Sequence, residues 1–328
     1  MKPWIIMRKG IRLNSFLEER MIFVVGSGIL LGALFHNQII AFKPFVPYVF
    51  AYMTLCIALG SSYRDFMKAF RQPRLYMVIF FCLHVVLPLL ATVITGIVLP
   101  NYPELRAGVI LGTAIPIGVA STIWVNISKG NPAVSLTAVI LNTLLSPLVV
   151  PLVILVTVGT SVHFDIHDLI HGLLLMIVIP TIIGVILHDL TRGQIKRKVS
   201  FFTGPSTKIL LAMVIATNMA AAWNSLHLLK SAIPLVMAVT FSMGCSGYLL
   251  GFFTGKIMGL STDLINTFIY TIGMRNITAG LVMALNYFPE ITAIPVVFAI
   301  MFQQPLAAVS LRLLVIKDPP SPNAKKHS

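Results

Sequence analysis

The feature that most constrains this chain is a series of long apolar runs separated by short polar gaps. A helix needs about 20 mostly apolar residues to cross the hydrocarbon core of a bilayer, which is roughly 30 Å thick. Ten runs have this length, and they cover residues 21–41, 45–61, 75–99, 104–128, 132–157, 167–188, 207–228, 231–257, 263–287 and 291–316. The sequence therefore predicts an all-α polytopic membrane protein with ten transmembrane helices.

The composition agrees with a membrane protein and argues against a nucleic-acid-binding protein. Of the 328 residues, 57% are hydrophobic and only 10% are charged, whereas soluble proteins carry about 25% charged residues. A net charge of +14 is also found in proteins that bind nucleic acid, but such binding needs a solvated basic face. Here the basic residues lie in short gaps between apolar runs, so we interpret them as determinants of membrane topology.

The distribution of Lys and Arg predicts the orientation. With the N-terminus placed in the cytoplasm, 20 of the 24 basic residues fall on the cytoplasmic side. The other side has Lys43, Arg106 and Lys230, and Arg275 lies inside a run. Because positive charges concentrate on the cytoplasmic side, both termini are expected there. We expect an integral protein of the bacterial inner membrane.

Ten helices divide the chain into two halves of five, which then have opposite orientations. We predict one transporter domain over residues 1–318, with one half over 20–157 and the other over 165–317. Inverted-repeat transporters have this arrangement, and their sites lie near the bilayer midplane at interrupted helices. The polar, Pro-rich segment 319–328 is predicted to be a disordered tail.

Matching interruptions occur in the fourth run of each half. Residues 112–122 contain Pro116 and Gly118, and residues 270–280 contain Gly273. A broken helix frees backbone N–H and C=O groups, which a membrane tolerates only beside a cavity, partner protein or ion. Gly and Pro often only kink a helix, but two interruptions in corresponding places predict a binding site. A GxxxG pair, Gly28 and Gly32, indicates helix packing instead.

Two ionisable residues lie well inside the runs. Arg275 is about 18 Å into its run, counted at 1.5 Å per residue. All ten acidic residues fall in tails, gaps or run edges, so Arg275 must use carbonyls, water or an anionic ligand. Either it caps a broken helix or it binds an anionic ligand, and we favour the second. His84 can titrate near neutrality or form a local hydrogen bond as a neutral ring.

No motif for hydrolysis or phosphoryl transfer is present. The pair Gly255-Lys256 lacks the earlier glycine and the following Ser or Thr of a phosphate-binding loop. No Cys/His metal pattern occurs, and the three cysteines are widely spaced within apolar runs. Metal binding by the His and Asp residues of 163–171 is conceivable, but a solvated loop is the favoured interpretation. We expect no enzyme activity, no cofactor and no metal beyond sodium.

These features together resemble the bile acid:sodium symporter family over residues 20–316. The resemblance rests on ten helices in two inverted halves and on the stretches Pro116-Ile-Gly118-Val-Ala-Ser121-Thr122, Gly130-Asn131-Pro-Ala-Val-Ser135 and Gly273-Met274-Arg275-Asn276. It implies a core of spans 3–5 and 8–10 that moves against a panel of spans 1, 2, 6 and 7. Spans 4 and 9 would cross at their breaks, with an organic anion bound beside the crossing.

Only some of the family's ligands for the first sodium ion are present in this sequence. Ser121 and Ser135 match hydroxyl ligands of the family. Thr122 stands where the family usually has Asn, and Val139 stands where a hydroxyl ligand is expected. Thr271 replaces a glutamate that the family shares between both sites. This position has therefore lost its carboxylate.

At the second site the departure is greater. The carbonyls of Ile272 and Met274 match ligands, but Arg275 replaces a glutamine. A further family glutamine falls near Leu83 or His84. Sodium prefers oxygen ligands and a nearby negative charge, and a guanidinium repels it. Our hypothesis is that Arg275 replaces the second sodium as a built-in charge, and sodium coupling is doubtful.

The predicted function is secondary-active transport of an organic anion, bile-acid-like or another carboxylate. Sodium symport with altered sites, proton coupling through His84 and exchange remain open. The alternative is a membrane receptor that binds an organic anion without moving it. The predicted partners are the anion and the lipid bilayer, with a monomer as one possible state. The candidate substrate-binding residues are Arg275, Asn276, Val119, Gln303, Gln304 and His84.

Overall fold

The computed structural model describes residues 10–17, 20–67, 72–159, 162, 164–226 and 232–316. Regular structure in these residues is helical, apart from one isolated antiparallel bridge between Ile117 and Arg275. This confirms the all-α prediction. The tail predicted to be disordered, 319–328, lies outside the described residues.

Seven helical stretches of the described chain are long and apolar enough to cross a bilayer. Each contains an 18-residue window of high mean hydropathy with few charges, as a spanning helix requires. The polytopic prediction is thereby confirmed. The stretches contain α4 (Val46–Ala58), α6 and α7 (Pro73–Phe81, Leu87–Val98), α10 (Pro132–Thr157), α11 and α12 (Ile166–Leu173, Ile179–Leu190), α13 (Gln194–Leu226), α14 (Ile233–Ile257) and α17 (Ala293–Leu313).

The other three predicted runs contain shorter helices. The first begins with α2 (Met21–Leu34). The fourth is divided into α8 (Pro103–Ala114) and α9 (Ala120–Ile127). The ninth is divided into α15 (Thr262–Gly273) and α16 (Ile277–Tyr287). Both interruptions that the sequence predicts are therefore present, at the expected residues.

Two predicted boundaries are wrong. The helix of the first run ends at Leu34, because Phe35 has a non-helical backbone (φ −117°, ψ 35°). The chain becomes helical again at His36, well before the predicted start at 45. Similarly, α13 begins at Gln194 rather than near 207. The basic residues that precede the apolar run are good helix formers, and their long side chains reach polar surroundings from a helix.

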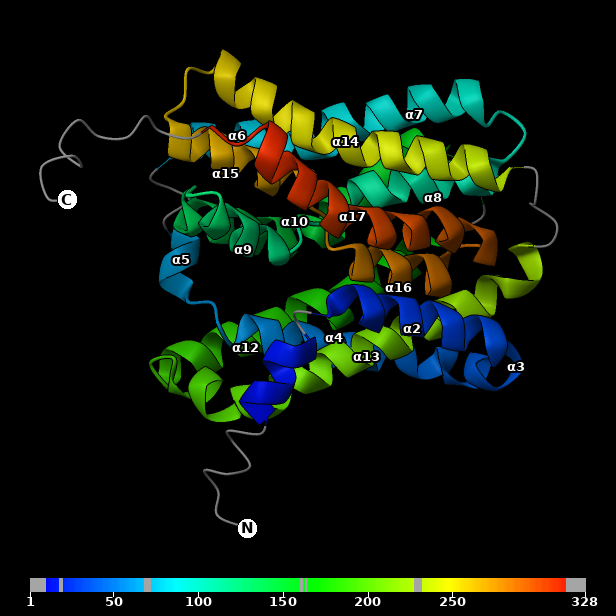
Figure 1. Ribbon diagram of the computed structural model, residues 1–328, viewed down its shortest axis with the longest axis horizontal. Helices are drawn as coiled ribbons and strands as arrows, with labels where there is room; N and C mark the ends of the chain where they lie inside the picture. The colour runs from blue at the N-terminus through cyan, green and yellow to red at the C-terminus, as the bar shows by residue number, and fades with distance from the viewer. Residues whose placement is uncertain are drawn as a thin grey trace, which may run out of the picture.

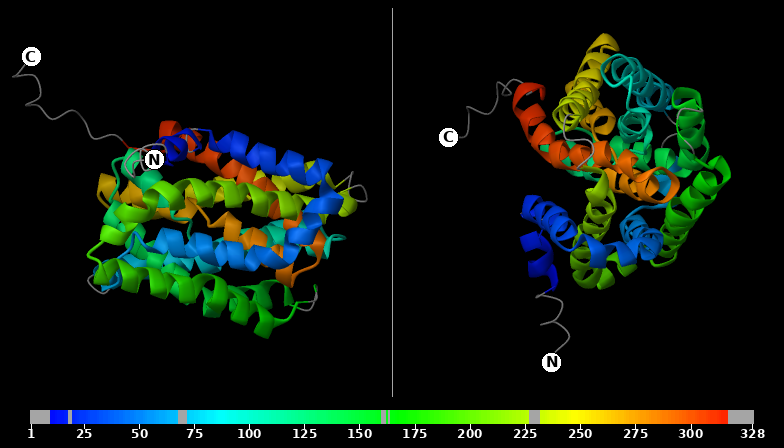
Figure 2. Two further views of the ribbon diagram at one scale, coloured as in Figure 1. Left: turned by 90° about the horizontal axis from the view of Figure 1, so that it is seen from below. Right: turned by 90° about the vertical axis from the view of Figure 1, so that its right-hand side faces the viewer.

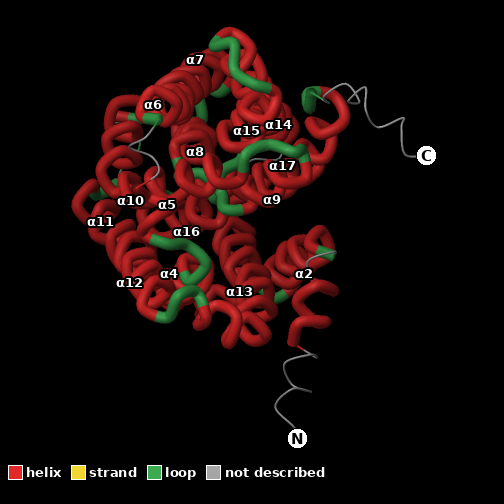
Figure 3. Tube along the Cα trace, turned by 90° about the vertical axis from the view of Figure 1, so that its left-hand side faces the viewer, coloured by secondary structure: helices red, strands yellow, loops and turns green. Residues whose placement is uncertain are grey.

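The helices form two groups. Figure 1 shows α2, α3 (His36–Ile39), α4, α12 and α13 on one side and α7, α8, α14, α15 and α17 on the other. The end-on views of Figure 2 and Figure 3 show the same division. Within the first group α2 packs on α13 and α4 on α12, and within the second α14 packs on α15 and α7 on α8. Helix α16 contacts α4 and α13 and so connects the two groups.

Small residues allow the close packing of α2 on α13. A Cβ atom added to Gly28 would lie 2.7 Å from the carbonyl oxygen of Ala212. One added to Gly32 would collide with the carbonyl oxygen of Ala216. The prediction that this GxxxG pair serves helix packing is confirmed.

Candidate functional site

The two interruptions meet and cross. Pro116 has no N–H and disfavours a helical conformation in the preceding residue, and Ile115 is accordingly extended (φ −60°, ψ 157°). Met274 is extended too (φ −111°, ψ 130°). The two segments pair antiparallel: Gly118 N–H donates to the Met274 carbonyl (3.2 Å) and Asn276 N–H donates to the Pro116 carbonyl (2.8 Å). Backbone groups that the breaks free are thus satisfied by each other.

Glycine at position 118 allows this pairing. A Cβ atom at Gly118 would lie 2.5 Å from the carbonyl oxygen of Arg275 and 2.9 Å from its carbonyl carbon. Real Cβ atoms do not approach backbone so closely. Only glycine lets the two backbones come together here.

Side chains from neighbouring helices satisfy the other backbone groups of the crossing. The Ile117 N–H donates to Asn142 Oδ1 of α10 (2.8 Å), and the Arg275 N–H donates to Gln303 Oε1 of α17 (2.9 Å). Because the Asn142 oxygen faces an N–H, its Nδ2 is the atom that meets His84 Nε2. Nδ2 can only donate, so His84 Nε2 is an acceptor and the ring is neutral.

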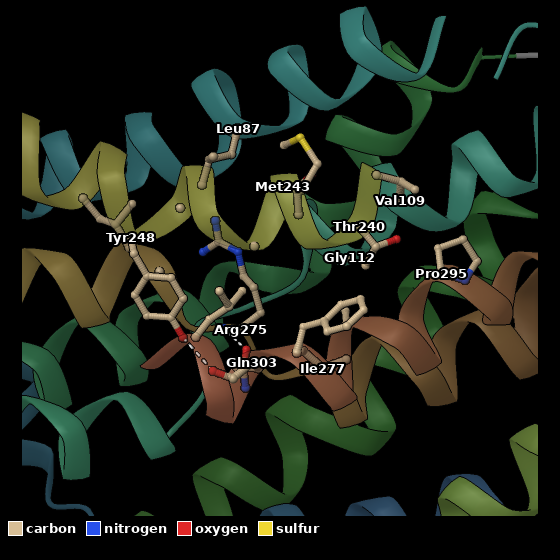
Figure 4. A pocket seen from close by; sticks show the side chains of 18 of the residues that line it. Leu87, Val109, Gly112, Thr240, Met243, Tyr248, Arg275, Ile277, Pro295 and Gln303 are labelled. Atoms are coloured by element: carbon tan, nitrogen blue, oxygen red, sulfur yellow. Dashed lines mark hydrogen bonds between the residues drawn. The ribbon is translucent and has the colours of Figure 1, made fainter. Parts of the chain in front are cut away.

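The side chain of Arg275 extends away from the crossing into a cavity between α7, α8, α14 and α17, shown in Figure 4. Arg275 is 7% exposed, and neither Nη1 nor Nη2 has a hydrogen-bond partner among the described residues. The cavity has a volume of about 60 Å³. Its lining includes Leu87, Gly112, Thr240, Met243, Gly247 and Tyr248.

A second cavity lies on the other side of the crossing, between the two groups of helices. It has a volume of about 80 Å³ and is lined by Phe50 and Thr54 of α4 together with Val119, Val139 and Asn276. Val119 and Asn276 are the N-cap residues of α9 and α16. The Asn276 Oδ1 accepts the Ala279 N–H (3.3 Å). Two helix N-termini, each with a partial positive charge, therefore meet at this cavity.

The hydroxyl groups at the first predicted ion position lie together. Ser121 Oγ is 3.2 Å from Ser135 Oγ, and Thr122 Oγ1 is 3.4 Å from the same atom. Thr271 Oγ1 is buried without a hydrogen-bond partner among the described residues. Three hydroxyls that bond one another, with no carboxylate in the set, are a weak set of ligands for a hard cation.

The remaining predicted residues have other surroundings. The Met274 carbonyl, a predicted ion ligand, accepts the Gly118 N–H. Ile272 lines the cavity that contains the Arg275 guanidinium. Gln304 Oε1 accepts the Trp124 Nε1–H (3.0 Å), so Gln304 links α17 to α9. The structure therefore brings Arg275 and Gln303 together, places Val119, Val139 and Asn276 in a separate cavity, and leaves Gln304 in neither.

Sequence reasoning did not assign roles to three residues of the site. Asn142 was visible as a polar residue within an apolar run, and that signal indicates a buried hydrogen bond. Tyr248, whose hydroxyl donates to the Gln303 carbonyl (3.0 Å), gave no such signal. The role of Thr240 could not be predicted from the sequence either, because the hydroxyl of a Thr in a helix usually bonds the backbone of its own helix.

Within residues 163–171, Asp165 has a structural role as a helix cap. Asp165 accepts hydrogen bonds from the backbone N–H groups of Asp168 (3.2 Å) and His167 (2.7 Å) and caps α11. These bonds favour the carboxylate and lower the pKa of Asp165. Among the described residues no group of three His, Cys, Asp or Glu side chains is placed to hold a metal ion. His163 lies outside the described residues.

Crossed, interrupted helices within a bundle of helices long and apolar enough to cross a membrane are typical of secondary transporters. A model of the sodium bile acid symporter family matches residues 46–228, which is more than half of the chain. The chain belongs to this family of membrane transporters.

Three relatives illustrate the range of similarity. YbaS of Bacillus subtilis (strain 168), described as uncharacterized, is 31% identical over 86% of this chain and 92% of its own length. YocS of the same organism, an uncharacterized sodium-dependent transporter, is 26% identical over 70% of both chains. BASS1 of Oryza sativa subsp. japonica, a probable chloroplastic sodium/metabolite cotransporter, is 26% identical over 64% of this chain and 51% of its own.

Proposed function

We propose that this chain is a secondary-active transporter of an organic anion and that it works by alternating access. The observation that carries the proposal is the cavity between the two helix groups, where the N-termini of α9 and α16 meet. Helix N-termini favour anions, and interrupted helices of transporters commonly use them to bind substrate carboxylates. Asn276 adds a polar side chain at the same place.

The proposed topology has ten spans in two inverted halves. The seven long helical stretches are completed by α2 and by the pairs α8–α9 and α15–α16, each pair crossing the bilayer as one interrupted span. The two groups of helices would correspond to a moving core and a panel. Both termini would face the cytoplasm of a bacterium, which the concentration of Lys and Arg on one side supports.

Sodium coupling is proposed to be weak or absent, although YocS is described as sodium-dependent. The hydroxyls of Ser121, Thr122 and Ser135 bond one another without a carboxylate. Arg275 introduces a buried positive charge where the family resemblance implies a second sodium. A fixed positive charge at that place disfavours a cation by Coulomb's law.

Uptake into proteoliposomes tests the function. The purified chain should take up an organic carboxylate such as a bile acid or a short keto acid, and binding without uptake would favour a receptor. Asn276→Asp retains the helix cap but adds a negative charge, so we expect uptake to fall at least about tenfold, or 1.4 kcal/mol. The matched control is Asn286→Asp, since within the described part of the chain the Asn286 amide bonds only the Val282 carbonyl of its own helix.

The ion dependence needs its own measurement. Uptake by the wild-type chain should be similar in sodium and potassium buffers. Arg275→Gln should weaken anion uptake or introduce a dependence on sodium. Strong, saturable sodium dependence of the wild type would contradict this part of the proposal.

A further inference from the structure

The guanidinium of Arg275 has no protein counter-charge. Among the described residues it is the only charged side chain that is buried. Both of its Nη atoms are without a hydrogen-bond partner there, and the hydroxyl of nearby Tyr248 donates instead to the Gln303 carbonyl. Leaving a buried charge unpaired is costly, and so is leaving its N–H donors without acceptors.

A second unpaired polar group lines the same cavity. Thr240 of α14 is 6% exposed, and its Oγ1 also has no hydrogen-bond partner among the described residues. Figure 4 shows Thr240 and the Arg275 guanidinium on the lining of one cavity. The site therefore offers a cation with several N–H donors and one hydroxyl donor, which is the set of groups that an anion needs.

The size of the cavity limits what it can hold. About 60 Å³ exceeds the 10–15 Å³ that one water molecule needs, but it is far below the 300 Å³ or more of sites for organic ligands. Glycines provide much of the space. A Cβ atom added to Gly112 would have no atom within 4 Å, so this part of the helix faces open room.

We infer that this cavity binds a small monovalent inorganic anion of the size of chloride, held by the Arg275 guanidinium. A water molecule would satisfy the hydrogen bonds but would leave the charge uncompensated. An anion supplies both the hydrogen-bond acceptors and the compensating charge. An organic carboxylate does not fit, because this cavity lies within one group of helices and does not widen when the two groups separate. This site is distinct from the proposed substrate cavity, which lies on the other side of the crossing.

The test is thermal unfolding of the purified full-length chain without any organic substrate. Melts in potassium chloride and potassium bromide are compared with melts in potassium gluconate at equal ionic strength. Gluconate carries the same charge but is too large for the cavity. We expect chloride and bromide to raise the melting temperature saturably, by on the order of 5 °C. Equal melting temperatures in all three salts would overturn the proposal.

Variants connect the effect to the cavity. Arg275→Gln should abolish the difference between chloride and gluconate. Gly112→Leu leaves Arg275 and Thr240 in place but fills the space, so it should abolish the difference as well. Its matched control is Gly26→Leu, since Gly26 also has open room but lines a different, uncharged cavity.

The site can also be located directly. Crystals grown in bromide should show an anomalous peak within hydrogen-bond distance of the Arg275 Nη atoms. If Gly112→Leu keeps the full chloride effect, or if no bromide lies in the cavity, water alone fills it and the proposal is wrong. None of these measurements depends on transport, so they separate this proposal from the proposed function.

Discussion

Asn142 connects the crossing to the rest of the molecule through both ends of one amide group. Its oxygen accepts the Ile117 N–H and its nitrogen meets His84 Nε2, which lies 58 residues away in the sequence. These two contacts satisfy the Ile117 N–H, the Asn142 amide oxygen and His84 Nε2 without a bridging water molecule. The other ring nitrogen of His84, Nδ1, is buried without a hydrogen-bond partner among the described residues.

Replacing Asn142 by leucine should therefore cost more than one hydrogen bond. Asn142→Leu leaves the buried Ile117 N–H and His84 Nε2 without partners, at about 1–3 kcal/mol each. We expect a clear loss of stability, measured as thermal unfolding in detergent. Asn218→Leu is the matched control, because among the described residues Asn218 bonds only the Val214 carbonyl of its own helix and its Oδ1 has no partner. An equal loss in both variants would contradict the assigned role of Asn142.

Single residues were predictable where they break a local rule. Arg275 in an apolar run and Pro116 in a helix both conflict with their surroundings, and the sequence therefore marks them. The partner of Asn142 was not predictable, because the pairing depends on how α10 packs beside residues 82–86. Likewise, the direction of the Arg275 side chain, away from the proposed substrate cavity, follows from the backbone of the crossing.

At the scale of elements, two glycines of one segment show what the crossing demands. Gly112 belongs to the last turns of α8 and faces open room. Gly118 precedes α9 and lies against the Arg275 carbonyl. The sequence alone does not distinguish these two glycines, since both interrupt the same run of apolar residues.

Alanine substitution should separate these two glycines. Gly118→Ala forces the paired segments apart, and overpacking of this kind costs about 1–3 kcal/mol. Gly112→Ala should be neutral or stabilising by up to about 1 kcal/mol, because alanine favours the helix. Unfolding temperatures of the two variants give the comparison. Similar behaviour of both would argue against close backbone contact at the crossing.

Elements were predicted best where hydropathy alone decides. The long apolar runs became helices, and the interruptions lie where Pro116 and Gly273 indicated them. The helix end at Phe35 was not predicted because no glycine or proline marks it. The start of α13 was not predicted because basic residues end the apolar run but are still compatible with a helix. Hydropathy reports contact with lipid, whereas helix ends depend on backbone hydrogen bonds.

At the scale of the whole molecule, the division into two groups of helices matters most. The cavity between them, about 80 Å³, is too small for an organic anion of bile-acid size. The groups must therefore separate to admit such a substrate. Helix α16 contacts α4 across the division, and Thr278 and Thr54 line the cavity from opposite sides.

Cross-linking the two groups should stop transport. In a background without the three native cysteines, a short bifunctional thiol reagent on Thr54→Cys/Thr278→Cys should reduce uptake at least about tenfold, because it prevents separation. The control pair is Gly255→Cys/Ile265→Cys, which joins α14 to α15 within one group, where a Cβ on Gly255 would lie 3.4 Å from that of Ile265. Unchanged uptake in the cross-linked test pair would exclude a relative movement at this place.

The crossing itself is held by backbone atoms: one hydrogen bond joins Gly118 to Met274 and another joins Asn276 to Pro116. Except at Gly118, where a side chain would collide, the identity of a side chain does not enter these bonds. Mutation can therefore alter the charge and size of residues at the crossing while the two segments remain paired. A cation at position 275 is therefore compatible with the same crossing as a neutral residue.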